Sequence, residues 1–279
     1  MLTAESETSR PAPSLAGVQH IIAVASGKGG VGKSTISVNL SLALSQEKKT
    51  VGLLDADIYG PNIPQMMGIS KSLEKSPSGK IQPLVSHDIR LISIGFVVGT
   101  SDAIIYRGPL VGKMIKRFLD DAEWGELDYL VIDLPPGTGD ASLTLAQSTA
   151  LTGVVIVTTP QQVALADVRK SISMFQRLRV PILGIVENMS YYVDPQSQSR
   201  SYIFGQGGGH VLSDELDLPF LGEIPLDPAV CAGGDAGKPI FLSHPESELA
   251  EVFRQISHNM TDRISQLARI DSPDIAISS

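Results

Sequence analysis

The sequence predicts an α/β fold, built on a doubly wound and mostly parallel β-sheet with helices on both faces. Seven short runs are rich in Val, Ile and Leu, and most of them are continuously apolar rather than alternating, which is typical of strands buried on both faces of a parallel sheet. Helical stretches separate these runs, and that alternation favours right-handed βαβ crossovers. No repeat or compositional break divides the chain, so we expect a single domain over residues 18–270.

The predicted strands are the runs HIIAVAS, TVGLLDAD, IRLISIGF, DYLVIDLPP, GVVIVTTP, PILGIVEN and PFLGEIP. The main predicted helices cover residues 34–46, 104–121, 161–178 and 246–267. The last of these places apolar residues at three- and four-residue steps, namely Leu249, Val252, Phe253, Ile256, Met260, Ile264 and Leu267. Its other face is acidic rather than basic, so we expect it to pack on the sheet instead of lying on an anionic membrane.

Two terminal segments and one internal segment look less ordered. Residues 1–17 lack the apolar centre of a secretory signal and contain Glu5 and Glu7, which favours a disordered lead. Residues 271–279 are expected to form a flexible tail. The polar stretch from Ser70 to Lys80 is interpreted as a surface loop.

Composition narrows the class of protein. Of the 279 residues, 42% are hydrophobic and 19% are charged, and no apolar run approaches the roughly 18 residues that span a membrane. The net charge of -8 argues against a protein that coats nucleic acid, because phosphate neutralisation needs a basic face. A single cysteine excludes an intrachain disulfide. We therefore expect a cytoplasmic protein with neither a membrane nor a nucleic acid as its partner.

A phosphate-binding loop follows the first predicted strand. Gly27 to Ser34 fit the pattern G-x-x-x-x-G-K-[ST] and open a predicted helix, as the mechanism of such loops requires. Glycines allow successive backbone N–H groups to converge on phosphate, and the helix adds its positive end. Lys33 would reach the outer phosphates, Ser34 would bind Mg²⁺, and Thr35 would support the phosphates. A glycine-rich turn without a ligand would explain neither Lys33 nor Ser34. The predicted nucleotide-binding residues of this segment are Gly27, Lys28, Gly29, Gly30, Val31, Gly32, Lys33, Ser34 and Thr35.

Acidic residues end two other predicted strands. Asp133 follows the run DYLVI and is the candidate carboxylate that holds Mg²⁺ through water. Asp57 is a candidate for orienting or deprotonating the attacking water, because doubly wound sheets keep their ligands at this edge. Asp55 lies two residues before Asp57, so both side chains point to the same side if the strand continues that far. Asp55 either takes part in the site or is only a solvated residue at the end of the strand.

The turn LPPGTGD after Asp133 could respond to the γ-phosphate, since glycine and proline give a loop with two defined settings. Asp140, at the end of this turn, has a simpler explanation as the N-cap of a helix that begins at Ala141.

Several motifs together resemble the Mrp/ApbC family of P-loop ATPases, a branch of the MinD/ParA group with a deviant Walker A loop. They are GKGGVGKST, DADIYGPNIPQMMG, DYLVIDLPPGTGD, VTTPQQVALADVRK, GIVENMS and IFGQGGG followed by PFLGEIPLDP, in this order between Val18 and Pro239. The resemblance implies ATP as the nucleotide and a homodimer bridged by it. It also implies that Lys28 reaches the partner's phosphates, that Asp57 activates water, that Asp133 belongs to switch II, and that Asn188 contacts adenine.

Mrp/ApbC relatives carry iron–sulfur clusters, many with a C-x-x-C pair soon after the ENMS segment. Here Asp194 and Ser197 stand where those two cysteines are expected. A dimer offers two Cys231 thiolates, whereas an all-cysteine [4Fe-4S] site needs four. The five histidines show no ligand-like spacing. Cys231 is interpreted as a small buried or loop residue.

Three functions remain open from the sequence. The first is an Mrp-type ATPase that serves iron–sulfur cluster assembly or delivery, with scaffold or apoprotein clients. The second is a MinD/ParA-like dimer switch that positions or regulates a partner without binding a cluster, which the missing C-x-x-C favours. The third, a nucleotide-binding scaffold with negligible turnover, is disfavoured by the presence of Lys28, Lys33, Asp57 and Asp133.

Overall fold

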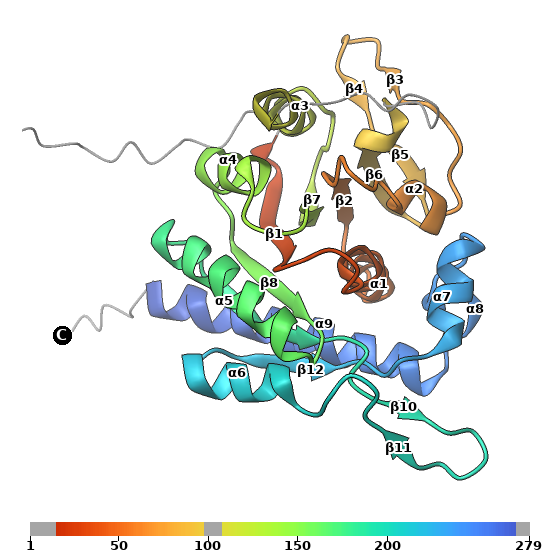
Figure 1. Ribbon diagram of the computed structural model, residues 1–279. Helices are drawn as coiled ribbons and strands as arrows, with labels where there is room; N and C mark the ends of the chain where they lie inside the picture. The colour runs from red at the N-terminus through yellow and green to blue at the C-terminus, as the bar shows by residue number, and fades with distance from the viewer. Residues whose placement is uncertain (1–14, 98–107, 272–279) are drawn as a thin grey trace, which may run out of the picture.

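A computed structural model describes residues 15–97 and 108–271 and has an eight-stranded central sheet (Figure 1). The strand order is β12-β9-β8-β1-β7-β2-β6-β5, and every pair is parallel except β5 with β6. The strands of the sheet are β1 (Val18–Ser26), β2 (Val51–Asp55), β5 (Leu84–Ser86), β6 (Ile89–Ser93), β7 (Leu127–Asp133), β8 (Gly153–Thr158), β9 (Ile182–Glu187) and β12 (Phe220–Glu223). All seven predicted strands are confirmed, together with the doubly wound, mostly parallel class.

Helices cover both faces of this sheet. One face packs against α1 (Lys33–Gln46), α8 (Ile240–Ser243) and α9 (Glu248–Asp271), and the other packs against α3 (Gly108–Asp120), α4 (Asp140–Ser148), α5 (Gln162–Arg177) and α6 (Gly208–Leu216). The remaining helices are α2 (Ile63–Met66), α7 (Pro228–Asp235) and a 3₁₀ turn at Ile94–Phe96. Two hydrophobic cores result, one on each side of the strands.

The α9 helix packs inward as its apolar stripe predicts. Leu249, Phe253, Ile256, Met260 and Ile264 are buried in the same core as α1. Val252 and Leu267 pack on the edge of this core. The stripe therefore forms part of the protein interior rather than a membrane-binding face.

Several details differ from the sequence-based expectations. The predicted lead of residues 1–17 is wrong at its end, because Leu15 is buried and Leu127 donates a backbone hydrogen bond to Gly17. The expected loop at 70–80 contains half of a small antiparallel hairpin, β3 (Glu74–Lys75) with β4 (Ile81–Gln82). Asp140 is the first residue of α4, and Gly139 takes the N-cap position instead. Residues 1–14, 104–107 and 272–279, which belong to the predicted lead, the helix predicted at 104–121 and the predicted tail, lie outside the described residues.

Candidate functional site

The loop between β1 and α1 has the backbone of a phosphate cradle. Gly30 and Gly32 adopt left-handed φ angles of 79° and 84°, which side chains other than glycine rarely tolerate. Gly27 lies against α5, where a Cβ atom would come within 2.4 Å of the Val168 nitrogen. The loop therefore depends on glycine for both its turns and its close packing.

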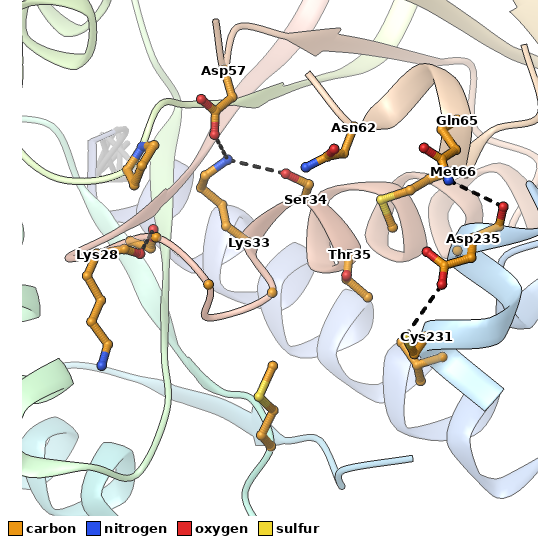
Figure 2. Close-up of a pocket in the computed structure, with 18 residues that line it drawn as sticks. Lys28, Lys33, Ser34, Thr35, Asp57, Asn62, Gln65, Met66, Cys231 and Asp235 are labelled. Atoms are coloured by element: carbon orange, nitrogen blue, oxygen red, sulfur yellow. Dashed lines mark hydrogen bonds and ion pairs between the residues drawn. The ribbon is translucent and has the colours of Figure 1, made fainter. Parts of the chain in front are cut away.

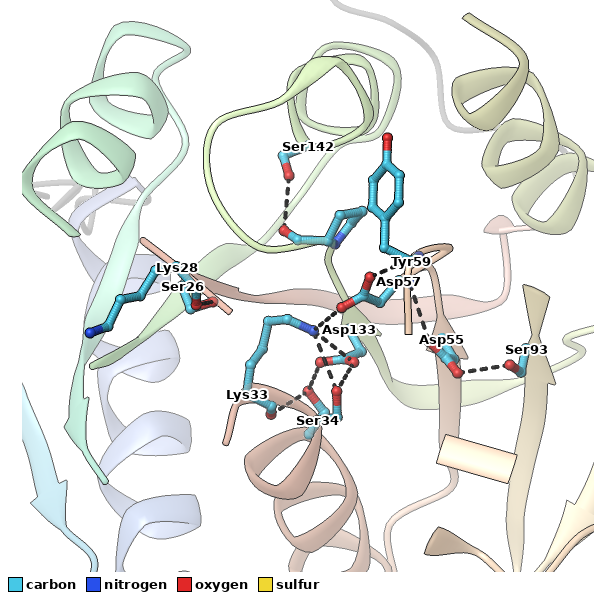
Figure 3. Close-up of polar contacts among 12 residues, drawn as sticks. Ser26, Lys28, Lys33, Ser34, Asp55, Asp57, Tyr59, Ser93, Asp133 and Ser142 are labelled. Carbon is cyan, nitrogen blue, oxygen red and sulfur yellow. Dashed lines mark hydrogen bonds and ion pairs between the residues drawn. The ribbon is translucent and has the colours of Figure 1, made fainter. Parts of the chain in front are cut away.

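Lys33 is the cation at the centre of the site (Figure 3). Its ammonium lies 2.9 Å from Asp133 Oδ2 and 3.3 Å from Asp57 Oδ2, and only 6% of its side chain is exposed. Burial works to lower the pKa of Lys33, but the carboxylates of Asp133 and Asp57 outweigh it and hold that pKa above its ordinary value. Lys33 is consequently a fixed positive charge at the carboxyl edge of the sheet.

Asp133 ends β7 and is completely buried. The Ser34 hydroxyl donates to its Oδ2 at 2.6 Å, and the Ser37 hydroxyl donates to its Oδ1 at 2.6 Å. Ser34 and Asp133, the two residues predicted to hold Mg²⁺, are thus in direct contact. Their hydroxyl and carboxylate oxygens are of the hard type that Mg²⁺ prefers.

Asp57 lies beyond the end of β2 and lines the same site. Burial raises the pKa of its carboxyl, although the nearby charge of Lys33 opposes that rise. A carboxylate with a raised pKa beside the lysine predicted to reach the outer phosphates is a suitable base or orienting group for water. The backbone N–H of Tyr59 donates to Asp57 at 3.3 Å and helps to hold the segment in place.

Asp55 does not solvate a strand end, so that interpretation is wrong. Its side chain is fully buried, next to Asp133 on the neighbouring strand, and accepts hydrogen bonds from the Ser93 hydroxyl at 2.7 Å and the Asp57 N–H at 3.2 Å. Burial, aided by the charge of Asp133, raises the pKa of Asp55 to about 8. Asp55 therefore supports the segment that carries Asp57, and its burial favours the protonated form of its carboxyl group.

The side chain of Lys28 extends away from the cluster of Lys33, Asp57 and Asp133 (Figures 2 and 3). It is half-buried, and within the described ranges it forms no ion pair. Lys28 is also one of the residues that line the cavity beside the phosphate loop.

A cavity of about 440 Å³ connects the phosphate loop to α7 (Figure 2). Its far wall comes from Gln65 and Met66 of α2, Met189, and Val230, Cys231 and Asp235 of α7. Sequence reasoning missed these residues as site residues, because nothing in their spacing shows that α2 and α7 pack together beside the loop. The cavity is therefore longer than the phosphate cradle and can accept more than phosphate.

Asn188 lies directly beneath the phosphate loop. Its Nδ2 donates to the Val31 carbonyl at 2.8 Å, and a Cβ atom on Gly32 would lie 2.2 Å from that nitrogen. The structure thus places Asn188 against the phosphate loop, and its contact with adenine stays a prediction. The contact that it shows is with the loop backbone.

Cys231 is exposed and lies in helix α7, so the interpretation of it as a buried or loop residue is wrong. Its Sγ lies 3.8 Å from Asp235 Oδ2. Among the described residues no group of three or more His, Cys, Asp and Glu side chains is placed to hold a metal ion.

Asp194 and Ser197 lie where the C-x-x-C pair is expected, in the turn between β10 (Tyr192–Val193) and β11 (Arg200–Ser201). They bind each other: Asp194 Oδ1 accepts from the Ser197 N–H at 2.7 Å, from the Ser197 hydroxyl at 2.9 Å and from the Gln196 N–H at 3.0 Å. The backbone N–H of Ser197 is the main cause of a lowered pKa at Asp194. These hydrogen bonds close the turn, so the residues do not fit a thiolate-ligated cluster.

Comparison with known proteins identifies the family. The ParA model, described as NUBPL iron-transfer P-loop NTPase, matches residues 17–261. The chain belongs to this family. Its activity class is accordingly nucleotide binding and hydrolysis by a P-loop NTPase.

Two curated relatives extend over most of the chain. The iron-sulfur cluster carrier protein of Synechocystis sp. is 47% identical over 96% of this chain and 78% of its own length. The protein of the same name from Escherichia coli K12 is 46% identical over 90% of this chain and 69% of its own.

Solved structures agree with the fold. An ADP-bound nucleotide-binding protein from Archaeoglobus fulgidus has a TM-score of 0.74 at 39% identity, covering 86% of this chain and 94% of its own. The cell division ATPase MinD of Pyrococcus furiosus has a TM-score of 0.67 at 24% identity, covering 88% of this chain and 99% of its own, and supports the fold alone. In the described part of the chain no helix is both long and apolar enough to cross a membrane.

The raised pKa of Asp55 predicts a specific pH dependence of stability. The folded state favours the protonated acid more than the unfolded state does, so this contribution to stability is full below pH ~4 and lost as pH rises through about 8. Asp55→Asn mimics the neutral acid and removes this loss. Urea unfolding should therefore show the stability of the variant relative to wild type increasing between pH 5 and pH 9.

Asp262→Asn, at an exposed position on α9, is the matched control. Its stability in urea unfolding should equal that of wild type at both pH 5 and pH 9. A constant difference between Asp55→Asn and wild type from pH 5 to pH 9 would show that Asp55 is not held in its neutral form.

Proposed function

We propose that this chain is a Mg²⁺-dependent ATPase whose ATP-bridged homodimer serves iron–sulfur cluster assembly or delivery to apoproteins in the cytoplasm. The observation that carries the ATPase part is the contact of Lys33 with Asp133 and Asp57 at the end of a glycine cradle. The names of the relatives, which are about 46% identical, support the iron–sulfur part.

In this proposal each residue of the site has a separate role in ATP hydrolysis. The backbone of Gly27–Thr35 binds the phosphates, and Lys33 turns from the carboxylates toward the β- and γ-phosphates. Ser34 and Asp133, the latter through water, would hold Mg²⁺, which when bound neutralises phosphate charge. Asp57 then orients the attacking water or accepts its proton. Asn188 would contact the adenine base beside Met189.

Lys28 would act across the dimer. Its side chain points away from the phosphate site of its own chain, which fits a lysine that reaches the phosphates of a second subunit. The phosphates would be surrounded by the full set of positive charges only when the partner subunit supplies its lysine. Hydrolysis would therefore depend on formation of the dimer.

The iron–sulfur cluster is treated as cargo that partner proteins ligate. Asp194 and Ser197 are engaged with each other, and the single cysteine lies on α7. In this proposal ATP-driven opening and closing of the dimer changes how a scaffold and an apoprotein meet. The second candidate is a MinD/ParA-like switch that acts on a partner without binding a cluster. The hydrogen-bonded turn of Asp194 and Ser197 favours it, because this turn replaces the C-x-x-C pair.

Lys28→Ala should leave MgATP binding within about threefold of wild type but lower turnover by about 10³-fold, because a charge supplied in trans acts mainly on the transition state. Calorimetry measures the binding, and phosphate release measures the turnover. Lys33→Ala is the comparison and should lose nucleotide binding itself. Normal hydrolysis by Lys28→Ala would contradict the trans-lysine role.

A transfer assay separates the two candidate functions. Under anaerobic conditions the chain alone, given iron and sulfide, should retain no stable cluster. With MgATP it should speed transfer from a cluster-loaded scaffold to an apo-ferredoxin severalfold, and Lys28→Ala should not. No acceleration would favour the cluster-free switch. A stable cluster that Cys231→Ser abolishes would instead place the cargo on this chain.

A further inference from the structure

Glu187 is a buried carboxylate to which none of the steps above assigns a task. It is the last residue of β9, and its side chain is completely inaccessible to solvent. Oε1 accepts a hydrogen bond from the Ser190 hydroxyl, and Oε2 accepts one from the backbone N–H of Gly209 in the first turn of α6. Within the described part of the chain, no cation pairs with it.

A buried carboxyl group destabilises the fold unless hydrogen-bond donors replace the water that its oxygens lose on burial. Glu187 receives only a hydroxyl and the N-terminal end of α6, both neutral. Gly209 allows this approach, because a Cβ atom there would lie 3.1 Å from Oε2. A neutral residue would pack at lower cost, so the carboxylate points to a task beyond packing.

The segment that Glu187 secures is the loop Asn188–Met189–Ser190. Asn188 donates from its side chain to the phosphate loop at Val31, and Met189 lines the nucleotide cavity. Met189 also has a φ of 54°, a left-handed conformation that costs free energy for a residue with a side chain. Such a loop keeps its shape only if both of its ends are held.

Glu187 holds the far end of this loop through Ser190, whose backbone N–H donates to Ile224 at 2.9 Å. The near end is held by the Asn188 N–H, which donates to Thr158 at 2.8 Å. Figure 2 shows that Cys231 and Asp235 of α7 lie across the cavity from Asp57, and Met189 also lines this cavity.

We propose that Glu187 is a positioning residue for the nucleoside part of the ligand: its carboxylate fixes Asn188 and Met189 against the phosphate loop. The inference rests on the proposed nucleotide function and adds a residue that decides how firmly the nucleoside is held. Glu187 does not touch the reacting atoms. Its loss weakens recognition of the nucleoside more than that of the phosphates, because Lys33 and the glycine backbone of the phosphate loop do not depend on a contact with Glu187.

Glu187→Gln tests the proposal because it keeps the size of the side chain but places an NH₂ group against one of the two donors. Calorimetry should show MgADP binding about tenfold more weakly, a change of about 1.4 kcal/mol. Inorganic tripolyphosphate with Mg²⁺, which has no nucleoside, should bind within about twofold of wild type. In steady-state ATP hydrolysis KM should rise about tenfold with kcat within about twofold.

Glu223→Gln is the matched control. Glu223 is the register partner of Glu187 on β12, lies 3.2 Å from the same Ser190 hydroxyl, but is half-exposed and pairs with Arg200. Its substitution should change neither ligand by more than about twofold. Glu187→Asp, which restores the charge, should recover part of the MgADP affinity.

Equal weakening of MgADP and tripolyphosphate by Glu187→Gln, or no weakening of either, would overturn the proposal and leave Glu187 with a purely structural role. If this variant does not fold, Ser190→Ala carries the test, with about threefold weaker MgADP binding and unchanged tripolyphosphate binding expected. Failure of wild type to bind MgADP would instead defeat the proposed nucleotide function, so the two failures are distinguishable.

Discussion

The contact between the Lys33 ammonium and the carboxylates of Asp133 and Asp57 is the interaction on which the site depends. Each carboxylate is buried beside the other acid at the carboxyl edge, and the Lys33 ammonium balances the negative charge that gathers there. The lysine in turn needs these acids, because burial alone would lower its pKa. In the proposed function, nucleotide binding would replace these carboxylates around Lys33 with phosphates and free Asp57 and Asp133 for water and Mg²⁺.

The parallel sheet makes this contact possible. Strands β1, β7 and β2 lie side by side and end at the same edge, so that residues distant in sequence meet there. The phosphate loop then closes over Asn188, which leaves no room for a side chain at Gly32. A second support lies behind that loop, where Glu187 ties β9 to the start of α6. On the proposed roles, separate buried carboxyl groups hold the catalytic wall and the nucleoside-facing wall.

Much of the fold and the phosphate end of the site could be predicted from the sequence. Continuous apolar runs identify buried parallel strands, and the order of Gly27, Lys33 and Ser34 depends only on local chain geometry. The cavity wall formed by Met66, Val230 and Cys231 could not be predicted, because it arises from the packing of α2 on α7. The burial of Asp55 and Glu187 could not be predicted either, because the residues at the end of a strand do not show which other segments cover them.

A crystal structure with MgADP bound tests the central claim most directly. The account predicts that Lys33 Nζ leaves Asp133 for the β-phosphate and that the Ser34 hydroxyl turns from Asp133 toward the metal, with the glycine loop otherwise unchanged. A structure with MgADP in the cavity and Lys33 still 2.9 Å from Asp133 would contradict it. In that case the buried cation would serve folding rather than phosphate binding.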